Sequence, residues 1–411
     1  MDGMFPHCAG LDVHKRFVVA CTLVAVPEGG VKREIKRFGT PPSELRALAA
    51  WLAARGITPA AMDSTGIYWK PVYNRLSHSL EVWVVNAAHL AQVPGRKTDI
   101  KDAEWIAPLM QPGLVQKSFV PDVLQRDLRD LTRYRTRLTQ ERTAVVKRLQ
   151  KLLEDANIKL ASVVTDIQGV SARAMLEALI AGEQDETIVA ALARGRLRPK
   201  IPALVEALAG QVRAHHRFLR HELRAHLDAL NERLRAISDQ LGQETQAYEG
   251  TIERLMQVPG VGRRTAEIIL AEIGADVSQF ATAGHLASWS CLCPGNRVRG
   301  GKRFSGKTRQ GQPWLRAALV EAAHAAARTR DTSLASQFHR SAARRGRKRA
   351  AVAVAHSIIG IIYPLLADPH ATFHDLGADH FIKRDQAHAP RRALKTLEQL
   401  GFSVTLSPLA A

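Results

Sequence analysis

Four aspartates in the first quarter of the chain have the residue type and the context to bind metal ions. Asp12 lies inside an apolar, strand-like run, Asp63 follows another, and Asp99 and Asp102 are three residues apart. A carboxylate in an apolar run is costly unless something neutralises it, and a divalent cation does this well. Four carboxylates are enough to hold two Mg²⁺ ions on a phosphodiester, and Mn²⁺ is a suitable substitute. The sequence therefore first suggests metal-dependent cleavage of a nucleic-acid backbone.

Each aspartate taken alone also has an ordinary structural explanation. Asp99 could cap a helix, with Asp102 one turn later, and Asp63 ahead of Ser-Thr-Gly could be a turn residue. His14, close to Asp12, is better explained as part of a polar strand segment than as a general base. A structural role for all four in this order is a weaker explanation than a shared metal site.

The elements that must position these residues are those of an α/β domain, residues 1–118. The expected elements are a strand over 9–26, a strand over 31–38, a helix over 43–55, a strand ending at 63, a helix over 69–79, a strand over 81–86 and a helix from about 99. Ser43 is the expected N-cap of the first helix and Gly56 its stop. This order is how an RNase H-like (RuvC-like) sheet is assembled. Ligands of such sheets bind at the carboxyl ends of strands, where Asp63 falls, with Asp12 on the neighbouring strand.

Residues 119–250 have the heptad spacing of long helices. One series is Leu124, Leu131, Leu138, Val145 and Leu152, with Leu128 and Leu149 between them; the other is Leu223, Leu230 and Ile237, beside Leu227, Leu234 and Leu241. Arg135 and Arg142 interrupt the first series. The two stretches predict an antiparallel coiled-coil arm or a dimerisation element, with short helices over 161–212 at its tip. An ordinary helical bundle core is an equal alternative.

A mainly helical C-terminal domain is expected over 251–370, followed by a tail over 371–411. Its start has the pattern of a helix–hairpin–helix, in which Gly260 and Gly262 let the turn approach phosphates. Residues 292–320 contain no acid, and their glycine-interleaved basic residues predict a loop or β-ribbon laid on phosphates. These residues are Arg297, Arg299, Lys302, Arg303, Lys307, Arg309 and Arg316, and a second basic cluster contains Arg345, Arg347 and Lys348.

The bulk composition favours a polyanionic partner. The chain has 411 residues, with 58 Lys and Arg against 39 Asp and Glu, a formal net charge of +19. Nucleic acid is the commonest partner of such a chain, and an acidic membrane surface is the competing one. The most apolar segment, 351–367, contains His356 and Pro364 and reads as a buried helix. We expect a cytoplasmic protein that does not enter the membrane, with four cysteines as free thiols.

Several short motifs occur together in a specific order. They are Gly-Leu-Asp-Val-His-Lys at 10–15, Asp-Ser-Thr-Gly-Ile-Tyr-Trp at 63–69, Lys-Thr-Asp-x-x-Asp-Ala at 97–103, Pro-Gly-Val-Gly at 259–262, Leu-Ala-Ser-Trp at 286–289 and Cys-Pro-Gly-Asn at 293–296. In these motifs the chain resembles the bacterial insertion-sequence transposases of the RuvC-like DEDD type, some of which are bridge-RNA-guided recombinases. The resemblance covers most of the chain.

The resemblance implies specific roles for these residues. Asp12, Asp63, Asp99 and Asp102 would be the metal-binding tetrad of the RuvC-like domain. A serine of the C-terminal domain would be the nucleophile and form a phosphoserine link to DNA, with the carboxylates of one protomer and the serine of another completing the site. A dimer or tetramer acting on element-end and target DNA, in some relatives with a guide RNA, follows from that arrangement.

The chain departs from the family pattern at two positions. Relatives usually have Glu where this chain has Asp63, which keeps the charge on a side chain one methylene shorter. In relatives a serine precedes the Gly-Lys-Arg of the basic loop, and here, aligned without a gap, that position holds Arg299. Arginine cannot act as a nucleophile, although it can clamp a phosphate. Ser305, six residues on, is the candidate replacement.

Three hypotheses follow from the sequence. The leading one is a Mg²⁺-dependent DNA recombinase that moves its own insertion sequence. The second is a junction-resolving or structure-specific nuclease with the same tetrad and water as nucleophile, which Arg299 favours. The third is a nucleic-acid-binding scaffold without catalysis. A covalent protein–DNA adduct would separate the first from the second.

Overall fold

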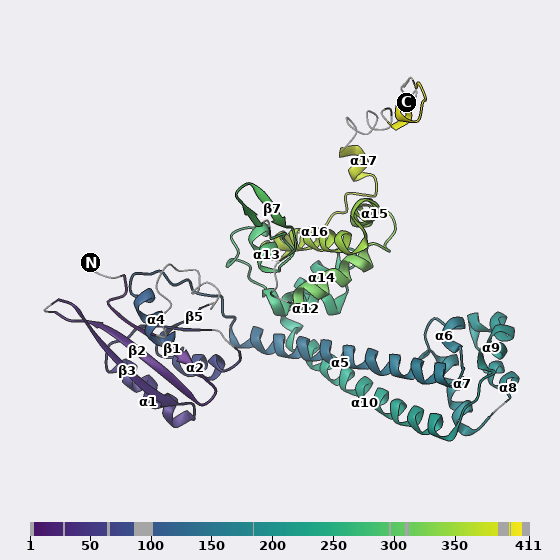
Figure 1. Ribbon diagram of the computed structural model, residues 1–411, viewed down its shortest axis with the longest axis horizontal. Helices are drawn as coiled ribbons and strands as arrows, with labels where there is room; N and C mark the ends of the chain where they lie inside the picture. Colours follow the sequence, from purple (N-terminus) through teal and green to yellow (C-terminus); the bar gives the residue numbers. More distant parts are fainter. Residues whose placement is uncertain are drawn as a thin grey trace. The chain divides into compact units, whose positions relative to one another are not determined.

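The computed structural model describes most of the chain as two compact units, Met1–Pro121 and Asp122–Ala411 (Figure 1). The described residues are 4–27, 29–63, 66–85, 102–183, 185–295, 297–308, 311, 313–384, 394 and 396–404. Asp99 and Arg309 lie outside these residues. For five other candidate residues only the backbone is described, and these are Asp102, Arg297, Arg299, Arg303 and Ser305.

The first unit is a mixed five-stranded sheet with helices on both faces. Its elements are β1 (His7–Val13), β2 (Phe17–Ala25), β3 (Val31–Gly39), α1 (Pro42–Ala53), β4 (Pro59–Asp63), α2 (Trp69–Leu76), β5 (Glu81–Val85) and α4 (Asp102–Met110). The strand order is β3-β2-β1-β4-β5. β1, β2 and β3 pair antiparallel, whereas β4 runs parallel to both β1 and β5.

Two local expectations for this unit are wrong. The single strand expected over 9–26 is two strands, because the chain reverses after Val13 and the His14 N–H donates to the Phe17 carbonyl at 2.9 Å. His14 therefore lies in a turn. Ser43 is not the cap of α1, since the helix begins at Pro42 and no side chain caps it. The nearby Glu44 carboxylate accepts from the Gly39 N–H at 3.1 Å instead. Gly56, with a φ of +63°, lies in the turn that follows α1 and stops the helix, as expected.

Successive side chains of each strand point to opposite faces of the sheet, so the core of this unit has two parts, one on each face. Leu11, Met62 and Phe38 belong to the cluster under α1 and α2. Val19, Cys21 and Ala61 belong to the cluster under α4. Cys8 is also buried on the α4 side, and burial raises the pKa of its thiol to about 12. All four cysteines are free thiols; three are buried and Cys293 is partly exposed.

The second unit contains two long antiparallel helices, α5 (Val123–Asp155) and α10 (Ala214–Glu244) (Figure 1). Their packed residues include Leu138, Val145 and Leu149 of α5 with Leu227, Leu230 and Leu234 of α10, as the heptads predict. The short tip elements between them are α6 (Leu160–Val163), α7 (Val170–Ala181), α8 (Glu186–Ala191), η1 (Gly195–Lys200) and α9 (Ile201–Leu208). They share the core of the two long helices, so that the tip closes this end of the arm.

The two arginines that interrupt the heptads make polar contacts. Arg142 Nε donates to Asn231 Oδ1 of α10 at 2.7 Å. Arg135 is 3% exposed and its Nη1 lies 2.6 Å from Glu267 Oε2, on a helix of the C-terminal domain. The first half of α5 therefore packs between α10 and that domain, and the heptad pattern changes there because the neighbour changes.

The rest of the second unit is mainly helical around one core. Its elements are η2 (Gln246–Tyr248), α11 (Glu249–Met256), α12 (Arg263–Ile273), α13 (Ala283–Trp289), β6 (Arg297–Arg299), β7 (Lys302–Ser305), α14 (Pro313–Ala326), α15 (Ser333–Arg345), α16 (Arg347–Ala367) and α17 (His380–Arg384). Among the described helices, α16 is the one long and apolar enough to cross a membrane. Val354, Ile358 and Ile362 on this helix are fully buried in the core, as expected for the segment 351–367.

Candidate functional site

Asp12 and Asp63 lie side by side at one edge of the sheet. β1 and β4 are parallel neighbours in the register that pairs Leu11 with Met62, and each aspartate is the next residue on its strand. Both positions are near the carboxyl ends of these strands, where open α/β sheets bind ligands. Two carboxylates that are 51 positions apart in the sequence therefore meet on adjacent strands.

The same register places both aspartates on the face of the sheet that α4 covers. A Cβ atom on Gly10 would lie 2.4 Å from the Ala103 carbonyl oxygen, so β1 meets the first turn of α4 there. Cys8, two residues earlier, contacts the Ala107 carbonyl oxygen one turn further along the helix. Moving along β1 towards Asp12 therefore moves towards the start of α4. Alternate residues share a face, so Asp12 follows Gly10 on this side.

Asp102 is the first described residue of α4, directly before Ala103. Its backbone therefore lies at the same edge and on the same face as Asp12 and Asp63. Of the four sequence-predicted aspartates, the fold brings these three positions together. Asp99, which is three residues earlier, lies outside the described residues.

The surroundings of Asp12 and Asp63 suit a hard cation. The Asp12 side chain is 15% exposed, and Asp63 Oδ1 is shielded from solvent. His14 Nε2 lies 3.0 Å from Asp12 Oδ2. Neighbouring carboxylates drawn in from water repel each other and are costly to ionise unless a cation joins them, and carboxylate oxygens are the ligands that Mg²⁺ prefers. The residues present therefore fit a metal ion at this edge.

The predicted basic ribbon is a two-stranded hairpin. β6 and β7 are antiparallel and are joined by Gly300 and Gly301, with φ of +56° and +72°. This two-glycine turn is typical of tight hairpins, because left-handed φ angles match the twist of the strands. Arg299 and Lys302 face each other across the turn, and Ser305 stands in the register position opposite Arg297, beyond a bulge.

The helix–hairpin–helix pattern is a turn between α11 and α12. Gly260 has a φ of +88°, and a Cβ atom there would lie 2.2 Å from the Ala322 carbonyl oxygen of α14. Gly262 precedes α12 with φ −91°, and nothing lies within 4 Å of its Cβ position. Gly260 thus has an internal packing role, whereas Gly262 leaves the helix start open to an approaching group.

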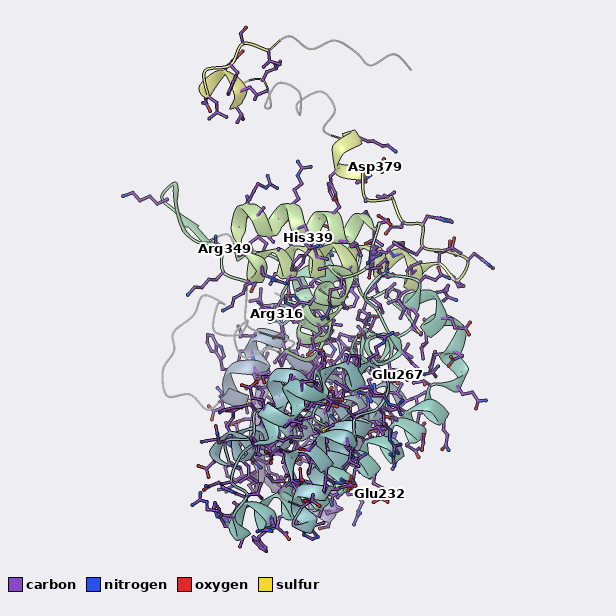
Figure 2. The ribbon with its side chains drawn as sticks, turned by 90° about the vertical axis from the view of Figure 1, so that its right-hand side faces the viewer. Glu232, Glu267, Arg316, His339, Arg349 and Asp379 are labelled. Atoms are coloured by element: carbon purple, nitrogen blue, oxygen red, sulfur yellow. The ribbon has the colours of Figure 1, made fainter. Side chains whose placement is uncertain are left out.

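The second basic cluster begins the core helix of the C-terminal domain. Arg345, Arg347 and Lys348 are all exposed, on either side of Gly346, where α15 ends and α16 begins. Figure 2 shows the neighbouring Arg349 on the side of the domain from which the β6–β7 hairpin projects. Two basic elements thus lie on one side of this domain, as a phosphate-binding surface requires.

One other group of possible metal ligands lies among the described residues, at the junction of the arm with its tip. His216 Nε2 lies 2.8 Å from Asp155 Oδ2, and the hydrogen bond from His216 lowers the pKa of Asp155. The Arg213 N–H donates to His216 Nδ1 at 3.2 Å, so Nε2 carries the proton and donates to Asp155. The Arg213 guanidinium also lies 3.3 Å from Asp155. These contacts close the helix ends and leave no lone pair on His216 for a metal.

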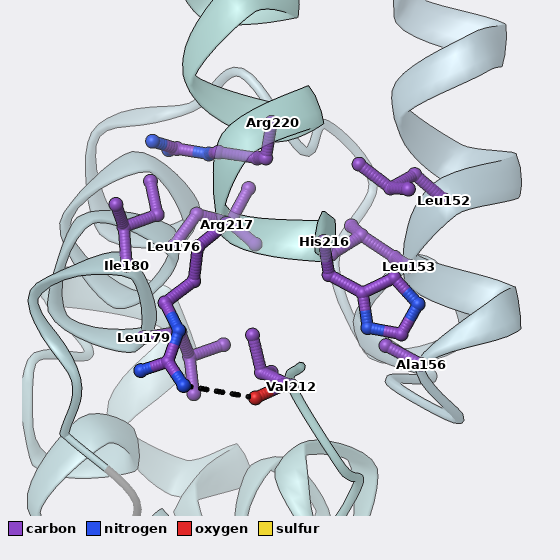
Figure 3. Close-up of a pocket in the computed structure, with 10 residues that line it drawn as sticks. All are labelled: Leu152, Leu153, Ala156, Leu176, Leu179, Ile180, Val212, His216, Arg217 and Arg220. Atoms are coloured by element: carbon purple, nitrogen blue, oxygen red, sulfur yellow. Dashed lines mark hydrogen bonds between the residues drawn. The ribbon is translucent and has the colours of Figure 1, made fainter. Parts of the chain in front are cut away.

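A small hollow beside this junction is equally unsuited to a substrate. It has a volume of about 20 Å³ and is lined mainly by apolar side chains such as Leu153, Leu176 and Leu179 (Figure 3). Arg217 on its rim donates to the Val212 carbonyl at 3.3 Å. Such a volume accommodates about one water molecule.

Comparison with known proteins matches the chain to transposases. Residues 9–158 match a family model described as a transposase, and residues 252–340 match the model of the Transposase IS116/IS110/IS902 family. A probable family 20 transposase of Pseudomonas aeruginosa is 26% identical over 274 residues, covering 65% of this chain and 71% of that protein. The transposase for insertion sequence element IS1111A of Coxiella burnetii is 27% identical over 281 residues, covering 67% and 68%.

The two matched segments include both the sheet edge with its aspartates and the turn and ribbon of the C-terminal domain. The chain belongs to the IS116/IS110/IS902 family of bacterial insertion-sequence transposases.

Proposed function

We propose that this transposase is a Mg²⁺-dependent DNA recombinase that cuts and rejoins the ends of its own insertion sequence. The observation that carries the proposal is the adjacency of Asp12 and Asp63 at the carboxyl edge of the sheet, with the start of α4 on the same face. The strand order β3-β2-β1-β4-β5, with three antiparallel strands followed by two parallel ones, supports an RNase H-like assignment of this unit.

Asp12, Asp63, Asp99 and Asp102 are the residues that would hold the metal. When bound, Mg²⁺ or Mn²⁺ would polarise the scissile phosphate and stabilise negative charge on the leaving oxygen. The protein's own contribution is to bring Asp12 and Asp63 together on adjacent strands, where the side chains are partly shielded from water. The shorter Asp63, in place of the usual Glu, retains the charge and the ligand type.

The nucleophile of the proposed reaction is a hydroxyl group, of either a serine or water. Arg299, at the position where relatives carry serine, sits beside the hairpin turn opposite Lys302, which suits phosphate binding. Ser305 is the serine available on the same ribbon. The proposed partners are element-end and target DNA, with a guide RNA as a further nucleic acid. We propose a dimer or tetramer acting in the bacterial cytoplasm.

A structure-specific nuclease is the second candidate, because Arg299 occupies the expected nucleophile position. It would use the same carboxylates with water. A covalent adduct on denaturing gels distinguishes the two, and Arg299→Ser and Ser305→Ala variants identify the residue involved. An adduct lost in Ser305→Ala supports the recombinase with a displaced serine, and cleavage without any adduct supports the nuclease.

The direct test uses the full chain with its element-end DNA, RNA transcribed from the flanking region and Mg²⁺. We expect Asp12→Asn to abolish strand cleavage, since the substitution removes a charged ligand with almost no change in shape. EDTA should have the same effect on the unmodified chain, and Mg²⁺ or Mn²⁺ should restore cleavage.

Asp239→Asn is the matched control, because Asp239 is exposed on α10 and the chemical change is identical. Cleavage that survives both Asp12→Asn and EDTA would show that the carboxylates are structural and would refute the proposal.

A further inference from the structure

A row of side chains extends from Asp12 across the sheet to Arg37 on the outer strand. Asp12 is paired with Val19 of β2, and Val19 is paired with Arg37 of β3. Residues opposite each other in antiparallel strands share a face. Arg37 therefore lies on the Asp12 face, two strands away, which corresponds to about 10 Å between the backbones.

The side chain of Arg37 is held in place by an aromatic ring. Its guanidinium carbon lies 3.6 Å from the centre of the Phe17 ring, and that ring is 4.5 Å from the ring of His14, centre to centre. His14 in turn contacts the Asp12 carboxylate at 3.0 Å. Arg37, Phe17, His14 and Asp12 thus form one continuous group on one face of the sheet edge.

Arg37 differs from Lys32 and Arg33, two other basic residues of β3, in its charge environment. Arg33 pairs with Glu104 of α4, and Lys32 pairs with Glu34. Arg37 is exposed, and no carboxylate of the described residues forms an ion pair with it. Its guanidinium is oriented by Phe17 while its hydrogen-bond donors stay available, and a planar fork of donors matches a phosphate group.

We infer that Arg37 is a phosphate-binding residue that holds the nucleic-acid strand next to the Asp12 edge. The inference rests on the proposed function, because it assigns a backbone contact to the strand that those carboxylates would cut. The ligand is the phosphodiester backbone of DNA or RNA, read without sequence preference. The run of basic residues in 32–37 is visible in the sequence, but only the pairing of the strands shows which face of the sheet Arg37 occupies.

Lys36 provides a matched control on the same strand. It carries the same charge and also lies over an aromatic ring, with its Nζ 5.0 Å from the centre of the Phe38 ring. Phe38 belongs to the core on the opposite face. If basic residues on β3 only protect an edge strand from pairing with other chains, substitution of Lys36 and of Arg37 has the same effect on nucleic-acid binding. If Arg37 contacts a phosphate, only the substitution of Arg37 weakens nucleic-acid binding.

The test measures binding of the full chain to labelled element-end DNA, and separately to RNA of the flanking region, by fluorescence anisotropy over a series of salt concentrations. We expect Arg37→Gln to weaken binding on the order of tenfold and to reduce the salt slope by about one, as expected when one phosphate is no longer bound. Arg37→Lys should keep the slope, and Lys36→Gln should change neither quantity. An effect on only one of the two ligands identifies the strand that is held.

Equal effects of Arg37→Gln and Lys36→Gln, or unchanged binding in Arg37→Gln, would overturn the inference. If Arg37→Gln lowers the melting temperature, binding is measured below the melting temperature of every variant, where the slope that Arg37→Gln loses must be kept by Arg37→Lys. Binding requires no cleavage, so the two proposals fail separately. A chain that binds through Arg37 but never cleaves refutes the recombinase, whereas cleavage with unchanged binding after Arg37→Gln refutes the phosphate contact.

Discussion

At the scale of single residues, a fully buried carboxylate joins the arm to the C-terminal domain. The Glu272 side chain of α12 has no exposed surface, and Arg133 of α5 binds both of its oxygens, at 2.7 and 2.8 Å. Arg129 Nε lies 3.7 Å from Glu272 Oε2 and donates to the carbonyl of Ala271 at 3.0 Å, and burial lowers the pKa of Arg129 to about 10. A charge buried this deeply is tolerated because its partners satisfy it.

Removing this carboxylate should destabilise the folded protein. We expect Glu272→Ala to lower the free energy of unfolding by about 3–5 kcal/mol, because two partly buried arginines lose their counter-charge. Urea denaturation of the full chain measures the change. Glu249→Ala is the control, since Glu249 pairs with Arg263 at the surface, where solvent screens the interaction. A cost no larger than that of Glu249→Ala would mean that the buried pair does not hold α5 to α12.

At the scale of elements, close contacts at glycine decide how helices are placed. Gly10 lets α4 approach β1, which sets the start of α4 at the Asp12 edge. Gly260 lets the α11–α12 turn approach α14 in the same way. A side chain at either position would meet backbone atoms, which cannot move aside as a flexible side chain can.

The turn glycines Gly260 and Gly262 should therefore respond differently to the same change. We expect Gly260→Ala to lower the free energy of unfolding by about 2–5 kcal/mol, because Gly260 has a left-handed φ and lies against Ala322. Gly262→Ala should lower the free energy of unfolding by less than about 1 kcal/mol, because it changes only the residue that caps the helix. Thermal unfolding measures both.

The same pair tests the role of the turn in binding. If α12 receives a phosphate at its open start, Gly262→Ala weakens binding of element-end DNA while leaving the fold nearly intact. Wild-type affinity in Gly262→Ala would mean that the start of α12 does not bind a phosphate of the DNA.

At the scale of the whole molecule, the sequence predicts periodic features better than contacts between distant segments. The heptads predict α5 and α10, and alternating apolar runs predict most of the strands, because both patterns repeat within one element. The sequence does not predict the turn at His14, because the apolar residues on either side of it have the pattern of one continuous strand. The partner of Arg135 could not be predicted, since Glu267 lies more than a hundred residues away and no local pattern links them.

Net charge is also a property of the whole molecule, and its effect on binding depends on where the charges lie. A surplus of +19 attracts any polyanion, but only charges that displace counterions from phosphates contribute to the salt dependence of binding. We expect replacement of the second basic cluster by glutamine to reduce the salt slope of DNA binding by about three, because each of the three side chains would neutralise one phosphate. The replacements are Arg345→Gln, Arg347→Gln and Lys348→Gln.

A second triple variant separates local contacts from net charge. Three exposed arginines at the tip of the arm can be replaced to lower the total charge by the same amount, and these are Arg194, Arg196 and Arg198. If the basic cluster at the start of α16 contacts the phosphate backbone, the tip variant keeps the full salt slope. Equal reductions of the slope in the two variants would mean that the chain attracts nucleic acid through its overall field. In that case the C-terminal basic surface would steer DNA to the protein without holding it.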